Sequence, residues 1–310
     1  MIAFLQALAP VILLVAVGWG VAERRVIGDK AWRSLERLVY FLFFPVLIIS
    51  VLAKASFDKV PVGMALTLVI AQATLGLTGL LARGTRGTQQ SGNPRKGSII
   101  QSNVRWNTFI GLSIAGAMFG ADGLALMALA VAILTSFANI LSVWALTHYS
   151  ENKDSKKPWI WWDMSRNPLI LACIAGIVLN ILGITPTGIV EQSLDLIGQI
   201  SIALGLLTVG AAIDVQSFRR TGPTTLLWSA VRLLGLPAAA FTAALFLDLS
   251  EIEMAIVIIA TATPTASSGY ILARQLGGDA KLSANLITVQ TVAAIITMPA
   301  IYTLYLSSLR

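Results

Sequence analysis

Charged residues are scarce in this sequence, and cysteine and histidine are nearly absent. Asp, Glu, Lys and Arg make up 12% of the 310 residues, about half of the fraction that soluble domains carry. The one cysteine, Cys173, lies inside an apolar run, so no disulfide framework is expected. One cysteine and one histidine, His148, do not make a Cys/His cluster. The sequence therefore predicts no structural disulfide and no metal-binding residue.

Acidic residues are missing from the apolar segments. All fifteen Asp and Glu residues fall in connections or within about a turn of a predicted helix end. A membrane exchanger of sodium for protons needs carboxylates at membrane depth, and a membrane-embedded enzyme needs a deep nucleophile with a base. The phosphate-binding motif GxxxxGK[ST] is also absent, which excludes a primary pump driven by ATP. We therefore expect no catalytic residue and no enzyme.

Apolar residues, in contrast, make up 56% of the chain, and the mean hydropathy is +0.79. They occur in runs of about 20 residues, the length that crosses a bilayer as a helix. The first run begins without a basic segment or a cleavage site, so we expect a first span and not a removed signal peptide. The predicted helices cover 3–22, 35–53, 61–82, 100–119, 123–147, 167–184, 194–213, 222–247, 252–274 and 282–306.

Basic residues divide unevenly between the two sides of the predicted membrane. The connections between helices 1–2, 3–4, 5–6, 7–8 and 9–10, together with the helix ends that adjoin them, hold 18 of the 22 Lys and Arg residues, including those in 83–99 and 148–166. The opposite side, with both termini, holds only Lys54, Lys59 and Arg310. The positive-inside rule therefore predicts a multi-pass protein of the plasma (inner) membrane, with both termini outside and the longer loops in the cytoplasm. The net charge of +7 follows from this topology, so the bilayer and not nucleic acid is the expected partner.

Two halves of the chain, 1–149 and 166–310, share short motifs at an offset of about 157 to 161 residues. Asn107 precedes Asp122 of a Gly-Ala-Asp sequence by 15 residues, and Pro264 precedes Asp279 of a Gly-Gly-Asp sequence by the same 15. Because each half contains an odd number of helices, the second half would be inverted. The predicted fold is an all-α polytopic membrane protein of ten helices, arranged as a 5+5 inverted repeat in one transporter domain.

Helix 9 contains a proline surrounded by hydroxyl residues, in the segment ATATPTASSG. Pro264 removes a backbone donor and frees a carbonyl group, which Thr263, Thr265 and Ser267 could help to satisfy. Non-helical backbone at membrane depth is tolerated where it is buried or lines a wet cavity, and half-helix N-termini there favour an anion. We expect helices 4 and 9 to be broken and to cross near Asn107 and Pro264, a proline kink in a continuous helix being the alternative.

The candidate substrate ligands are the polar residues beside these two breaks, and they would donate hydrogen bonds to a carboxylate. Hydroxyls within helices often bond only to the preceding turn, whereas the buried amide of Asn107 needs more partners than a helix supplies. Asn103 and Arg105 lie one turn earlier, on the cytoplasmic approach. The full set is Asn103, Asn107, Thr108, Pro264, Thr265, Ser267 and Ser268.

Arg232 is the one charged residue deep inside a predicted helix, and such residues are usually functional. It could contact the substrate, support the crossover, or extend toward the cytoplasmic interface. Gln72 is its counterpart at an offset of 160, and Gln290 lies in the middle of helix 10. We group these three residues as candidates for crossover support or charge compensation.

Several segments give the chain a resemblance to a known family. TPTASSGYILARQLGGD at 263–279, with ITMP at 296–299, resembles the auxin efflux carrier family, whose bacterial members include proposed malate and malonate permeases. RNPLILACIAGIVLN at 166–180 is similar to the sixth helix of that family, and NTFIGL at 107–112 is similar to its broken fourth helix. The resemblance covers nearly the whole chain.

The resemblance implies the fold of bile-acid symporters and sodium/proton antiporters. In that fold a scaffold of helices 1, 2, 6 and 7 carries a moving domain of helices 3–5 and 8–10, commonly in a homodimer. Plant members hold the auxin carboxylate with an asparagine that corresponds to Asn107. They have proline immediately before it, where this chain has Trp106.

We therefore expect a secondary carrier of small organic anions such as carboxylates, working by elevator-type alternating access, with efflux driven by the membrane potential and no cofactor. A sodium-coupled anion symporter is the alternative, since freed carbonyl groups could bind Na⁺. A sensor or structural membrane protein without transport activity is a more remote alternative.

Overall fold

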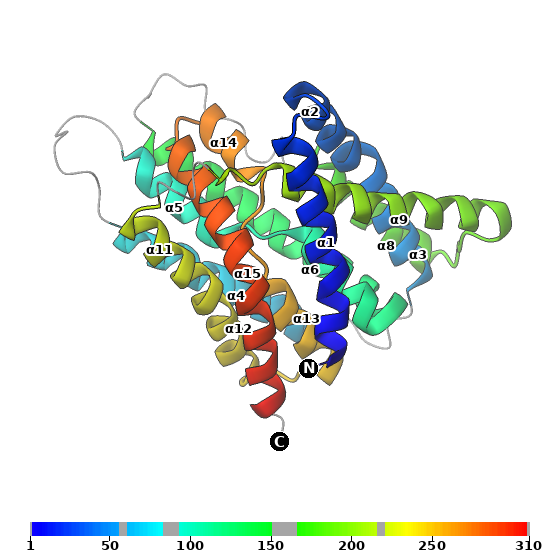
Figure 1. Ribbon diagram of the computed structural model, residues 1–310. Helices are drawn as coiled ribbons and strands as arrows, with labels where there is room; N and C mark the ends of the chain where they lie inside the picture. The colour runs from blue at the N-terminus through cyan, green and yellow to red at the C-terminus, as the bar shows by residue number, and fades with distance from the viewer. Residues whose placement is uncertain (1, 56–60, 83–92, 151–165, 216–220, 309–310) are drawn as a thin grey trace. The chain divides into compact units, whose positions relative to one another are not determined.

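The computed structural model describes residues 2–55, 61–82, 93–150, 166–215 and 221–308 (Figure 1). Every regular element in these ranges is helical, and they contain no strand. Seven helical stretches in this part of the chain are long and apolar enough to cross a membrane, and Pro168–Ile181 is a shorter apolar helix. The prediction of an all-α chain with many membrane-length helices is confirmed. The count of ten membrane-spanning helices and their arrangement as an inverted repeat stay predictions.

The helices include two short π-helices, η1 and η3, and one 3-10 helix, η2. α2, η1 and α3 follow one another without a gap, and so do α11, η3 and α12. In chain order the elements are α1 (Ile2–Glu23), α2 (Asp29–Leu38), η1 (Val39–Phe43), α3 (Phe44–Lys54), α4 (Val62–Thr78), η2 (Gly79–Leu81), α5 (Pro94–Val104), α6 (Thr108–Tyr149), α8 (Pro168–Ile181), α9 (Gly188–Ala211), α11 (Pro223–Ala230), η3 (Val231–Gly235), α12 (Leu236–Ala244), α13 (Glu251–Ala262), α14 (Gly269–Gln275) and α15 (Ala280–Ser308).

Several helices begin earlier than hydropathy predicts. α5 begins at Pro94 and not at residue 100, because Pro94 fits the first helical position and the Asn93 side chain accepts a hydrogen bond from the Lys96 N–H. α2 begins at Asp29 and α9 at Gly188, each six residues before the predicted start. Charged and polar residues interrupt the apolar pattern in these extensions, so a hydropathy pattern does not detect them. The remainder of the predicted loops, 83–92 and 151–165, lies outside the described residues.

The chain divides into two compact units. Unit 1 comprises Met1–Val60, Thr108–Ala132 and Met164–Ala212, and unit 2 comprises Pro61–Asn107, Ile133–Asp163 and Ile213–Arg310. α6 contributes to both units, and its backbone leaves the helical conformation at Gly120 (φ 60°, ψ −138°). This glycine lies between the predicted end of helix 4 at residue 119 and the predicted start of helix 5 at residue 123. The assignment of a scaffold and a moving domain stays a prediction.

In unit 1, α1 and α9 pack closely against each other (Figure 1). Their close approach is possible because a glycine of each helix lies against the backbone of the other helix. A Cβ atom added at Gly18 would overlap the backbone of Leu207, and one added at Gly210 would overlap the carbonyl group of Val15. Small residues that allow backbones to approach are typical of helix packing in membranes, where apolar side chains gain little by leaving lipid. Substitution of either glycine would therefore force these helices apart.

The end of α3 is held by polar groups from α8 and α9. The Asn180 side chain donates to the carbonyl oxygens of Ala53 (3.3 Å) and Ala55 (2.6 Å), where the helix has no N–H partners of its own. Lys54 Nζ lies 3.0 Å from Glu191 Oε1 and 3.0 Å from Asp195 Oδ1. These ion pairs are partly exposed, so their contribution to stability is modest.

Both π-helices directly precede a proline-containing helix. η1 ends at Phe43, before Pro45, and η3 ends at Gly235, before Pro237. A proline ring clashes with the carbonyl group four residues earlier in an α-helix. The wider π-turn changes that register, so each proline is accommodated without ending its helix.

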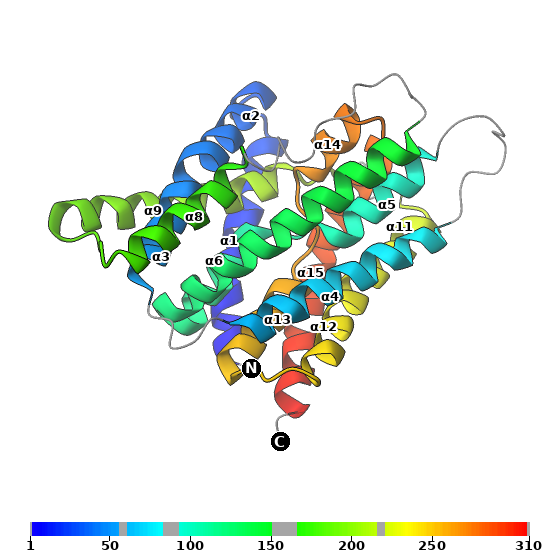
Figure 2. The same ribbon diagram turned by 180° about the vertical axis from the view of Figure 1, so that it is seen from behind.

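In unit 2, α4 packs against α5, α12 and α13, and α15 packs against α5, α11, α13 and α14 (Figure 2). One apolar cluster joins Ala82, Ile99, Trp228, Leu282 and Leu286. Polar side chains are also fully buried in this unit. They do not belong to the apolar cluster, and several of them bond to backbone groups at two places where helices end.

Candidate functional site

Two helices of unit 2, α5 and α13, end near the predicted positions, and the chain becomes helical again a few residues later. α5 ends at Val104 and α6 begins at Thr108, so residues 105–107 form a first interruption. α13 ends at Ala262 and α14 begins at Gly269, so residues 263–268 form a second interruption. Both breaks expected from the sequence are present, and a proline kink within a continuous helix is wrong for Pro264.

One threonine hydroxyl links the two interruptions. The backbone N–H of Asn107 donates to Thr263 Oγ1 at 3.3 Å, and Thr263 Oγ1 donates to the carbonyl oxygen of Ala260 at 2.8 Å. Ala260 is the residue whose carbonyl group would bond to position 264 in a continuous helix, where proline has no N–H. Thr263 therefore satisfies the freed carbonyl, as predicted, and also receives the backbone of the first interruption.

Arg232 caps the C-terminal ends of both interrupted helices. It lies in η3 and is fully buried (0% exposed). Its Nε and Nη2 atoms donate to the carbonyl oxygen of Arg105 at 3.2 and 3.1 Å, and Nη1 donates to that of Thr261 at 2.8 Å. Helix C-termini carry partial negative charge, and the planar guanidinium can donate to several acceptors at once. The guanidinium lies on the backbone of the interruptions, so extension toward the cytoplasmic interface is wrong.

Gln72, the predicted counterpart of Arg232, bonds to the neighbouring carbonyl group. It is fully buried in α4, and its Nε2 atom donates to the carbonyl oxygens of Val104 (2.7 Å) and Leu134 (3.1 Å). Arg232 and Gln72 thus bond to the consecutive carbonyl groups of Arg105 and Val104. Together they stabilise the end of α5, which no proline terminates.

Gln290 holds the segment that follows Pro264. Its Oε1 atom accepts a hydrogen bond of 3.0 Å from the backbone N–H of Thr265. Its Nε2 atom has no hydrogen-bond partner in the described part of the chain. The Thr265 N–H, one of the groups expected to face an anion, is therefore already bonded to a side chain.

The remaining predicted ligands lie in different environments. Asn107 and Thr265 are buried, whereas Ser267 and Ser268 are partly exposed. Ser268 Oγ accepts a hydrogen bond of 2.8 Å from Arg105 Nη2.

Asn103 is fully buried and donates to the carbonyl oxygen of Leu75 at 3.4 Å, so it joins α5 to α4. Thr108 is the first residue of α6 and belongs to unit 1.

Two residues of this site were not predicted. Gln101 Nε2 donates to the carbonyl oxygen of Gly269 (2.9 Å) and to Ser283 Oγ (3.2 Å), which joins α5 to α14 and α15. Asn139 Oδ1 accepts a hydrogen bond of 3.1 Å from Arg105 Nη1. The available signal was an amide side chain within an apolar helix, the reasoning that was applied to Asn107 alone.

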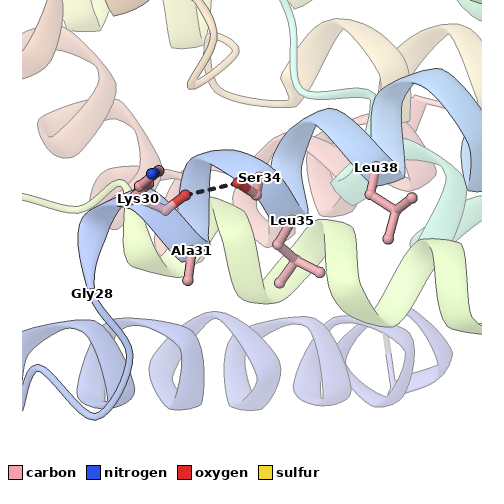
Figure 3. A pocket seen from close by; sticks show the side chains of 6 residues that line it. All are labelled: Gly28, Lys30, Ala31, Ser34, Leu35 and Leu38. Carbon is pink, nitrogen blue, oxygen red and sulfur yellow. Dashed lines mark hydrogen bonds between the residues drawn. The ribbon is translucent and has the colours of Figure 1, made fainter.

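A hollow on the surface of unit 1 does not resemble a binding site. Figure 3 shows that it lies along α2, and none of the predicted ligands lines it. The hydrogen bond from Ser34 Oγ to the Lys30 carbonyl oxygen (3.0 Å) in its wall stays within that helix. Within the described residues no group of three or more His, Cys, Asp or Glu side chains could hold a metal ion.

Comparison with known proteins gives a match over almost the entire chain. A family model described as "Membrane transport protein" matches residues 3–302. An uncharacterized transporter of Methanothermobacter thermautotrophicus is 23% identical over 299 residues, which covers 95% of this chain and 96% of the relative. An uncharacterized transporter of Methanocaldococcus jannaschii is 22% identical over 295 residues, covering 93% and 94%. The chain therefore belongs to the membrane transport protein family, the family of the auxin efflux carriers.

Proposed function

We propose that the protein is a secondary carrier of small organic anions such as carboxylates, and that it works by elevator-type alternating access. The observation that carries this proposal is the way in which the helix ends at the two interruptions are bonded. Arg232 donates to carbonyl groups at the ends of α5 and α13. Its charge offsets about half a negative charge at each of these C-termini. The negative helix ends are thus neutralised from within the protein.

The helix that restarts after the first interruption presents a positive end there. Thr108 begins α6 immediately after Asn107, so the N–H groups of that helix start at the interruption. Helix N-termini favour anions. The described residues include no buried Asp or Glu that would oppose an anion. We propose that the carboxylate binds beside the two interruptions of unit 2, with Asn107, Ser267 and Ser268 as ligands and Pro264 and Thr265 shaping the segment.

Efflux driven by the membrane potential is the proposed direction. Outward movement of one negative charge across an inside-negative membrane gains about 2.3 kcal/mol per 100 mV. This favours accumulation outside by roughly fifty-fold without a coupled ion. A uniporter of anions therefore needs no cofactor and no catalytic residue.

A sodium-coupled anion symporter is the second candidate, and one observation favours it. Within the described residues the amide oxygens of Gln72, Gln101 and Asn103 are buried and accept no hydrogen bond. Carbonyl-type oxygens are the groups that coordinate Na⁺ in transporters with broken helices. The dependence of transport on a sodium gradient separates the two candidates.

The ten-helix architecture is part of this proposal. α6 alone has 42 residues, which would extend about 63 Å if straight, far beyond the ~30 Å hydrocarbon core. More than one crossing is therefore needed, with a turn at Gly120. Gly120 and Gly277 both have a positive φ (60° and 75°) and are 157 residues apart, which supports two inverted repeats. A scaffold, a moving domain and a homodimer complete the proposed assembly.

The proposed topology has both termini outside and follows from the distribution of Lys and Arg. The only native cysteine, Cys173, is buried, so it can be replaced by alanine and single cysteines introduced at Ser34 and Ser308. In intact cells an impermeant thiol reagent should label the cysteine at 308 and not the one at 34. Labelling at 34 instead would reverse the topology.

The test of the anion site is binding by the purified protein. We expect mono- or dicarboxylates such as acetate, benzoate and succinate to raise its unfolding temperature. A hydrogen bond to an ionised group contributes about 1.5–3 kcal/mol, so Asn107→Ala should weaken carboxylate binding roughly ten- to a hundredfold. Asn180→Ala is the matched control, because it removes an asparagine that caps α3 in unit 1.

The control should lower stability without changing affinity. If no carboxylate stabilises the wild-type protein, the proposal of an organic-anion carrier is wrong. If Asn107→Ala binds carboxylates normally while the wild type also binds them, the anion site lies elsewhere.

A further inference from the structure

The amide group of Gln290 is fixed in one orientation by the backbone of the second interruption. The side chain comes from α15 and is fully buried (0% exposed). The N–H of Thr265 can only donate, so it requires the oxygen and not the nitrogen of the amide, and that oxygen lies 3.0 Å away. The NH₂ group must therefore face away from Thr265.

This NH₂ group has two N–H donors and no acceptor in the described part of the chain. A buried donor without an acceptor is unfavourable, so an acceptor is expected when the protein is functional. The buried amides of Gln72, Gln101 and Asn103 differ from it, because in each of them the unbonded atom is an oxygen. Among these four amides, only Gln290 presents a donor, and a carboxylate is an acceptor only.

We propose that Gln290 is a substrate-binding residue whose NH₂ group donates to the carboxylate of the transported anion. The Thr265 N–H acts with it by holding the amide oxygen. This inference rests on the proposed anion-carrier function and adds one ligand from α15 to the site. The competing explanation is that Gln290 only accepts from Thr265, with a buried water molecule bonded to its NH₂ group.

Gln290→Glu separates these explanations because it replaces only the NH₂ group at the end of the side chain. The new carboxyl group keeps an oxygen for the Thr265 N–H and replaces the NH₂ group by a second oxygen. When ionised, this oxygen repels a bound carboxylate; when protonated, its O–H can donate to it. A nearby anion raises the pKa of a carboxyl group, so binding should be accompanied by proton uptake.

The measurement is calorimetric binding of acetate and benzoate, which stay ionised from about pH 6 to 8, to the full-length protein in detergent. We expect wild-type affinity to change little over this range. Gln290→Glu should bind at least tenfold more weakly at the upper end and recover as the pH falls through the pKa of the introduced carboxyl. A Gln290→Met variant, which loses both polar atoms, should bind weakly at every pH.

Thr291→Val is the matched control on the same helix. Thr291 is also buried, and its hydroxyl donates to the Ile287 carbonyl oxygen within α15 (2.7 Å). This variant should bind both anions like the wild type. A Gln290→Glu variant that binds like the wild type across the range would overturn the inference and leave the carrier function intact. Failure of the wild type to bind either anion would count against both. If Gln290→Glu does not fold, unchanged affinity of Gln290→Met would overturn the inference in the same way.

Discussion

The two interruptions of unit 2 end their helices in different ways. The first covers residues 105–107 and contains no proline, whereas the second covers residues 263–268 and contains Pro264. In the first, partners on other helices bond to the helix end, since Gln72 and Arg232 bond to the carbonyl groups of residues 104 and 105. In the second, the neighbouring Thr263 bonds to the carbonyl group that proline frees. A helix can therefore be broken at membrane depth without proline if distant side chains satisfy its backbone.

Arg232 serves both interruptions, so its loss should have the largest effect. Arg232→Met leaves the Arg105 and Thr261 carbonyl groups without their guanidinium donors. Each unsatisfied buried carbonyl costs about 1–3 kcal/mol, and we expect a total loss of up to about 6 kcal/mol in the free energy of unfolding. Thermal and denaturant unfolding of the purified protein measure this loss.

Arg232→Lys is the control for charge, because an ammonium group cannot donate in a planar fork to both carbonyl groups. We expect it to recover only part of the stability. If Arg232→Met were as stable as the wild type, the capping of both interruptions by this residue would be wrong.

Trp106 should affect only the first interruption. Its side chain is buried in the position that precedes Asn107, where plant members of the family have proline. Trp106→Ala removes a large buried side chain, and such changes cost about 3–5 kcal/mol. Trp106→Phe keeps most of the ring and should cost much less. Unfolding measurements on both variants test this, and equal stability of the alanine variant and the wild type would show that packing does not hold the first interruption.

The sequence predicted the positions of both interruptions because proline, asparagine and hydroxyl residues are unusual within apolar helices. It also predicted that Thr263, Thr265 and Ser267 could satisfy backbone freed by Pro264. Thr263 does so, through a local contact. It could not predict which carbonyl groups Arg232 contacts, because Arg105 lies 127 residues away and only helix packing brings the two together. The orientation of the Gln290 amide and the polar start of α5 at Pro94 were missed for related reasons. The former depends on a long-range partner, and the latter carries no hydropathy signal.

Pro264 should affect transport more than stability. A proline in a helix interior costs about 3 kcal/mol, so Pro264→Ala lowers the free energy of a continuous helix relative to the interrupted one. A shift of about 1.4 kcal/mol would already lower the ratio of interrupted to continuous helix tenfold. We expect the unfolding temperature to change little and transport in proteoliposomes to fall roughly tenfold or more. Pro45→Ala, beside η1 in unit 1, is the control and should transport normally.

Hydrogen exchange at residues 263–268 tests the structural part of this prediction, because a continuous helix protects backbone amides that an interruption exposes. Protection should increase in Pro264→Ala. Normal transport together with unchanged exchange would mean that the second interruption persists without proline, as the first one does.

The smallest expected effect is that of sodium, for which we predict no change in transport. None of the described Asp and Glu residues is buried, so neither interruption contains a carboxylate that would pair with Na⁺ at membrane depth. Proteoliposomes loaded with radiolabelled benzoate or acetate should show efflux that follows the imposed potassium-diffusion potential and is the same with Na⁺ or with an equal concentration of choline. Reversing the potential should reverse the preferred direction, because the transported species carries one negative charge.

Strict dependence of transport on Na⁺ would instead favour the sodium-coupled symporter. Gln72→Met and Asn103→Leu would then show whether the unbonded amide oxygens near the first interruption bind the ion.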